Sequence, residues 1–111
     1  KLKKKATKEE VLDAFKTSSR INLIHYDQGL VSNNTIKEMY LDMGRPWGDM
    51  YEVALWEDML KVVGDELFYA YVVDNQAIVI PETIDAIRAL TGIERDGHTS
   101  IAKTNKSLGI N

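Results

Sequence analysis

The sequence predicts an α+β fold: a small helical domain with one antiparallel β-hairpin, in the order helix, strand, helix, helix, strand, strand, helix. Three capping boxes mark the starts of three helices. Two β-branched and aromatic runs around Asp74 and Asn75 indicate the hairpin. At 111 residues and 44% apolar residues, the chain is long enough for one core.

The first helix is predicted over about 8–18. The Thr7 hydroxyl can accept from the third backbone N–H, and the Glu10 carboxylate can reach back to the cap. The apolar residues that follow share one helical face: Val11, Leu12 and Phe15. Residues 21–26 are β-prone and end at a turn signal, which predicts a short strand.

A second helix is predicted after several possible caps in the run Ser32, Asn33, Asn34 and Thr35. Thr35 with Glu38 forms another capping box, and Gly44 suits the left-handed cap that ends the helix. Pro46 then forces a break. A third box, Asp49 with Glu52, predicts the longest helix over about 50–63. We expect this helix to be central and to pack on the hairpin through three core residues: Trp56, Leu60 and Val63.

The hairpin is predicted at about 67–80, with its turn at Asp74 and Asn75. Pro81 suits the first turn of a last helix, and Gly92 suits its left-handed end. From Glu94 onward the composition is polar and typical of a mobile tail, which a few apolar residues could anchor: Ile101, Leu108 and Ile110.

These elements predict three regions: a basic N-terminal arm over 1–6, one globular α+β domain over 7–93, and a polar tail over 94–111. The first six elements match the order of a winged helix-turn-helix, in which a hairpin wing follows the third helix. The alternative is a generic α+β domain, with helices on one face of a small antiparallel sheet.

Charge is unevenly distributed along the chain. The first twenty residues carry a local charge of +4, residues 27–96 carry −9, and the last fifteen are basic again. Carboxylates on the predicted third helix would repel a phosphate backbone and remove the gain from counterion release. An acidic face of this kind suits a basic protein partner.

Several classes of chemistry have no signature here. Without cysteine, there can be no disulfide, thiolate metal site or cysteine nucleophile. His25 and His98 lie far apart and lack a carboxylate at ligand spacing, and the glycines do not form a phosphate loop. No run suits a signal peptide or a membrane span. The sequence therefore predicts a cytoplasmic protein that is not an enzyme and has no cofactor or metal.

The leading functional hypothesis is a small non-catalytic module that binds a basic protein surface as a regulator, inhibitor or immunity-type protein. Its predicted partner-binding residues are Arg45, Trp47, Asp49, Glu52 and Glu57. The alternative is a winged-helix DNA-binding regulator that uses its wing and basic arms, with contacts to nucleic acid from Lys1, Lys3, Lys4 and Lys5.

Overall fold

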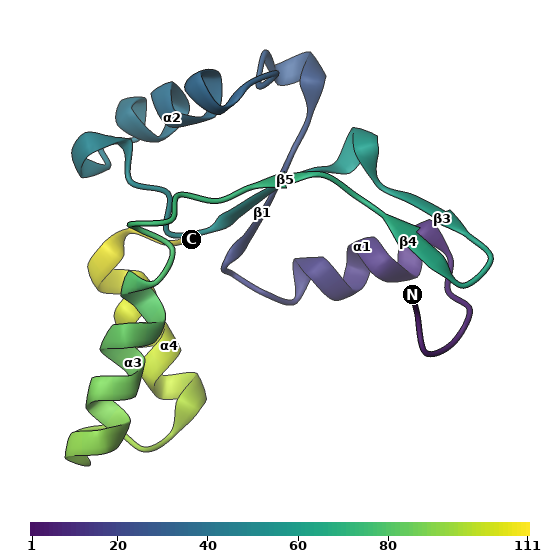
Figure 1. The fold of residues 1–111 in the computed structure, drawn as a ribbon. Coiled ribbons are helices and arrows are strands. Elements are labelled where there is room, and N and C mark those ends of the chain that lie inside the picture. Colours follow the sequence, from purple (N-terminus) through teal and green to yellow (C-terminus); the bar gives the residue numbers. More distant parts are fainter.

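Four α-helices and five short strands make up the chain, and the computed structural model describes all residues 1–111. This content is generally α+β (Figure 1). The helices are α1 (Lys8–Lys16), α2 (Asn33–Asp42), α3 (Ile80–Thr91) and α4 (Gly97–Leu108). The strands are β1 (Ile21–Ile24), β2 (Val53–Trp56), β3 (Lys61–Val63), β4 (Glu66–Phe68) and β5 (Tyr71–Val72). Short 3-10 turns occupy Tyr26–Gln28, Pro46–Gly48 and Glu57–Met59.

The centre of the molecule is a three-stranded mixed sheet in the order β1-β2-β5. β1 and β2 run parallel, with Ile21 beside Val53 and Ile24 beside Trp56, and α2 lies in the connection between them. β5 pairs antiparallel with β2 on its other edge. A separate two-stranded hairpin is formed by β3 and β4.

The predicted helix over 50–63 is wrong, because this segment contains β2, a 3-10 turn and β3. β2 has strands on both edges, and its last three residues are buried. A short, nearly continuous apolar run is typical of such a buried strand. Trp56 and Leu60 are buried as expected, but Val63 is exposed.

The predicted hairpin turn at Asp74 and Asn75 is also wrong. The chain reverses instead between β3 and β4, where Gly64 has a left-handed φ of +63°. The Asp74 carboxylate accepts hydrogen bonds from the backbone N–H groups of Gln76 and Ala77, at 3.1 and 3.3 Å. This local turn leads the chain toward α3 and leaves no second strand after it.

Without a third helix before the hairpin, the element order is not that of a winged helix. The acidic helical face expected over 50–63 is absent for the same reason.

The other helices begin and end where local signals place them. Thr7 and Glu10 form the reciprocal capping box of α1, with hydrogen bonds of 3.1 and 2.8 Å. Of the possible caps before α2, Ser32 is the one used, and it forms its capping box with Thr35 rather than through Thr35 and Glu38. Pro81 lies in the first turn of α3, and Gly92 ends it with a φ of +72°.

The polar C-terminal segment folds as α4 and packs beside α3 (Figure 1). Asp96 caps α4 by accepting from the Thr99 N–H at 2.7 Å. Beyond the helix, Ile110 is buried in a cluster with Tyr51 and Ala77. The segment thus returns to the body of the molecule.

The buried apolar residues form three separate clusters of seven, four and three members. The largest lies between the central sheet and α2, and the second lies between α1 and the other face of the sheet. Only 20 of the 111 residues are buried. The Cα radius of gyration is 15.6 Å, whereas a self-contained domain of this length has one of about 13 Å.

Candidate functional site

One histidine and two carboxylate side chains gather where the parallel strands β1 and β2 end. His25 directly follows β1, and Glu57 and Asp58 directly follow β2. The His25 Nε2 atom lies 3.4 Å from the Glu57 carboxylate, and its Nδ1 atom lies 3.8 Å from Asp58. Ligands of open α/β sheets bind at this end of parallel strands. A partly exposed imidazole between carboxylates has the chemistry of a proton donor or acceptor.

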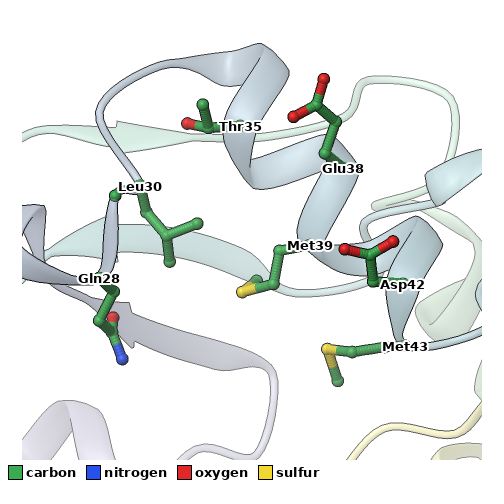
Figure 2. A pocket seen from close by; sticks show the side chains of 8 residues that line it. Gln28, Leu30, Thr35, Glu38, Met39, Asp42 and Met43 are labelled. Atoms are coloured by element: carbon green, nitrogen blue, oxygen red, sulfur yellow. The ribbon is translucent and has the colours of Figure 1, made fainter.

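An open cavity of about 500 Å³ lies next to this edge, between α2 and the 3-10 turn after β1. Figure 2 shows the side chains of Leu30 and Met39 pointing toward one another across it. The Glu38 and Asp42 carboxylates, one helical turn apart on α2, are exposed at its edge. The cavity therefore combines an apolar wall with an acidic rim.

A buried ion pair connects distant parts of the chain. Arg45 donates to the Glu52 carboxylate through both terminal nitrogens, at 3.0 and 2.5 Å. The same guanidinium donates to the Asp49 carbonyl and, beyond α4, to the Gly109 carbonyl, each at 3.1 Å. It therefore ties the loop before β2 to the C-terminal segment.

Aromatic rings complete the surroundings of this guanidinium. Arg45 lies over the rings of Tyr40 and Tyr51, at 5.1 and 4.8 Å from their centroids. Burial raises the pKa of the Tyr40 hydroxyl, although the hydrogen bond from Asn22 opposes this change. The phenol thus stays protonated and can stack on the cation without competing charge.

A second polar network lies between α3, α4 and the start of β1. The Asp85 carboxylate accepts from Ser100 at 2.6 Å, from Thr104 at 2.7 Å and from Arg20 at 2.5 Å. Burial alone would raise the pKa of Asp85, but these three hydrogen bonds together outweigh it and hold the pKa below its ordinary value. The carboxylate is thus charged in the folded protein.

The predicted partner-binding residues do not share one surface. Arg45 and Glu52 are buried against each other, so their side chains are not available to a partner. Trp47 is 84% exposed and has a left-handed φ of 59°. Asp49 and Glu57 are half-buried in different parts of the fold. A protein partner at Trp47, Asp49 and Glu57 stays a prediction.

The N-terminal lysines are exposed, as expected of a basic arm. Lys1 forms an ion pair with Asp65 at 3.4 Å, whereas Lys3, Lys4 and Lys5 make no ion pair. The backbone of the arm is held by a hydrogen bond from the Leu2 N–H to the Asp65 carbonyl at 2.7 Å. Nucleic-acid contact through this arm stays a prediction.

Sequence reasoning missed the cluster of His25, Glu57 and Asp58. The signal was present, since each of these residues follows a short β-prone run. Treating 50–63 as a helix hid it, because only parallel pairing of the two strands brings residues so far apart in sequence together.

Two further features are absent from the fold. No group of three or more His, Asp or Glu side chains is arranged to hold a metal ion. None of the helices combines the length and the apolar character required to cross a bilayer.

The chain is similar in sequence to part of several dehydrogenases. No protein-family model matches it. It is 43% identical over 109 residues to glyceraldehyde-3-phosphate dehydrogenase of Pyrococcus furiosus, covering 98% of this chain and 32% of that protein. It is 42% identical over 102 residues to the enzyme of the same name from Methanobrevibacter smithii, covering 92% and 30%. The Methanopyrus kandleri enzyme is 38% identical over 109 residues.

The chain therefore spans about a third of the length of the curated relatives it matches. Their names overturn several expectations. The hypothesis of a non-catalytic regulator or inhibitor is wrong, and so is its alternative, the winged-helix DNA-binding regulator. The expectation that the protein is not an enzyme is wrong for the same reason. The uneven charge distribution misled the functional prediction, because the charge of a protein surface reports on solubility and partners and not on catalysis.

Proposed function

We propose that this chain forms part of a dehydrogenase that acts on glyceraldehyde 3-phosphate. The observation that carries the proposal is the 43% identity to the Pyrococcus furiosus enzyme across 98% of the chain. An identity of 43% over 109 residues is not confined to one short motif. A location in the cytoplasm is part of the proposal.

The chain would contribute framework and site walls to such an enzyme. It contains no cysteine and no glycine-rich loop between a strand and a helix, so it supplies neither a thiolate nor the usual dinucleotide-binding turn. What it offers is the carboxyl edge of β1 and β2, with His25 between carboxylates, beside the open cavity next to α2. The nicotinamide cofactor of a dehydrogenase supplies hydride chemistry when it is bound.

A chimera tests this proposal. The 111 residues would replace the matching 109 residues of the Pyrococcus furiosus enzyme, and oxidation of glyceraldehyde 3-phosphate would be followed through the absorbance of the reduced nicotinamide. We expect turnover within about a hundredfold of the parent enzyme, since misplacement of site groups by a mutation distant from the chemistry costs about that much. The parent enzyme is the positive control, and the same enzyme without the segment is the negative one.

Folding of the chimera must be measured alongside its activity. A chimera with the circular dichroism and the native mass of the parent, but without turnover, would contradict the proposed function. An unfolded chimera would instead be repeated with the Methanobrevibacter smithii enzyme as host, which is 42% identical to the chain.

A further inference from the structure

One side of α2 brings two methionine side chains to the open cavity. Met39 lies on the helix, Met43 is its C-cap four positions later, and both line the cavity. Figure 2 shows both side chains on the side of α2 that faces Gln28 and Leu30. Cβ atoms at this spacing on a helix are about 5–6 Å apart. Because methionine side chains are unbranched and flexible, their two sulfurs can reach a single ion between them.

The two methionines differ in their freedom of movement. Met39 is half-buried and packs against the largest core cluster, so its neighbours hold it in place. Met43 is 52% exposed, so its side chain can turn toward Met39. A site formed by this pair therefore has one fixed ligand and one adjustable ligand.

The charges around the cavity favour a cation. Glu38 and Asp42 line it and are exposed, and neither carboxylate forms an ion pair; the neighbouring Lys37 pairs with Asp74 instead. Two like charges four positions apart on a helix repel each other. Asp42 is also the last residue of α2, where the helix dipole is negative. A bound cation would relieve both unfavourable interactions.

The ligand atoms favour a soft metal ion. The chain has no cysteine, so its four methionines carry all of its sulfur. Met50 is buried and Met59 lies in the 3-10 turn after β2, so the cavity is lined by the other two. Thioether sulfur selects Cu(I), whereas Mg²⁺ and Ca²⁺ take oxygen ligands.

We propose that the cavity beside α2 binds a soft monovalent metal ion, Cu(I), through the thioether sulfurs of Met39 and Met43. The sulfur lone pairs are donated to the ion, and its oxidation state does not change. Glu38 and Asp42 attract the ion and balance its charge. Such a thioether pair differs in kind from the His, Asp and Glu clusters that the fold lacks. The inference goes beyond the proposed function and does not depend on it.

The test titrates the 111-residue chain with Cu(I) under nitrogen, and separately with Ag(I), which shares the preference for thioethers but is not oxidised by air. Competition with a colorimetric Cu(I) chelator gives the affinity. Nuclear magnetic resonance of the methionine methyl groups identifies the ligands. We expect one ion per chain, with shifted methyl signals for Met39 and Met43 and unchanged signals for Met50 and Met59.

Met39→Leu and Met43→Leu should each weaken binding by roughly tenfold or more, because losing even an outer partner of a metal site costs that much. Leucine keeps the volume and the apolar character of methionine, so neither variant should unfold. Met59→Leu is the matched control, since Met59 is 46% exposed but lies outside the cavity. It should leave the affinity unchanged.

A further control is excess Mg²⁺, which should not displace the bound ion, because thioethers are poor ligands for hard cations. Three results would overturn the inference. The first is that neither Cu(I) nor Ag(I) binds. The second is binding that Met39→Leu and Met43→Leu leave unchanged. The third is displacement by Mg²⁺, which would assign the binding to the carboxylates of Glu38 and Asp42 alone.

Discussion

The guanidinium of Arg45 and the carboxylate of Glu52 form a bidentate ion pair, and the two side chains are 5% and 8% exposed. The two residues come from opposite ends of the loop that leads into β2. The same guanidinium reaches the Gly109 carbonyl. One pair therefore positions the central strand relative to the C-terminal segment, and its loss should affect the whole structure.

Replacing Glu52 with Gln should lower the free energy of unfolding by about 3–5 kcal/mol, because it leaves the Arg45 charge buried without a counter-charge. Urea unfolding followed by tryptophan fluorescence measures this change. Asp13→Asn breaks the exposed ion pair with Lys16 and should cost less than about 1 kcal/mol. Equal effects of the two substitutions would show that the buried pair has no special role.

Gly48→Ala should destabilise the protein more than Gly44→Ala. Both glycines have a left-handed φ, +69° and +88°. A Cβ at Gly48 would lie 2.8 Å from the backbone carbonyl oxygen of Lys37, whereas one at Gly44 would meet nothing within 4 Å. Gly44→Ala should cost about 1 kcal/mol from backbone strain alone, and Gly48→Ala clearly more. Thermal melting of both variants decides this, and equal melting temperatures would contradict the predicted clash.

Two substitutions of Trp56 should separate the contribution of its packing to stability from that of its hydrogen bond. Its indole N–H donates to the Leu30 carbonyl at 2.6 Å inside the largest core cluster. Trp56→Phe should cost about 1–3 kcal/mol, since it leaves that buried carbonyl without its partner. Trp56→Ala should cost about 3–5 kcal/mol, since it also leaves a cavity. Chemical denaturation gives both values, and a well-tolerated Trp56→Ala would rule out this core.

The α3–α4 contact should weaken in acid. The folded pKa of Asp85 lies below its ordinary value of about 4, so its stabilising effect is complete above about pH 4. This effect is lost as the pH falls through the folded pKa. Asp85→Asn should therefore be less stable than the unmodified protein at pH 7, and the difference should shrink below pH 4. Unfolding curves between pH 2 and pH 7, at about one-unit steps, measure it.

The control for this acid effect is Glu82→Gln. Glu82 also contacts Arg20, but its side chain is 62% exposed. Its removal should change stability little at any pH. A difference between Asp85→Asn and the unmodified protein that persists unchanged at low pH would assign the effect to packing rather than charge.

Trp47→Asn should leave the stability unchanged or raise it, by about 1 kcal/mol at most. Trp47 is largely exposed and has a left-handed φ, a conformation that Asn adopts more readily than an aromatic residue. Differential scanning calorimetry measures the change. A loss of stability would show that the indole makes contacts that outweigh the strain of its backbone.

Short-range signals in the sequence determined the ends of α1 and α3. The capping box of Thr7 with Glu10 appears in the structure where it was predicted. So do Pro81 in the first turn of α3 and Gly92 at its end. They could be predicted because a cap needs only groups three or four residues apart, which the chain places together in any context.

The secondary structure of the segment over 50–63 was decided by tertiary structure alone. Its local pattern suits a helix, but Val53–Trp56 instead pairs with Ile21–Ile24, about thirty residues earlier. The hydrogen bonds of a strand belong to a distant partner, so no local window shows whether that partner exists. The same pairing brings His25 beside Glu57 and Asp58, and the folding of the polar tail as α4 places Ser100 and Thr104 on Asp85. The sequence by itself determined where its helices could start and stop; contacts between distant residues decided which segment became the central strand and which side chains meet at its end.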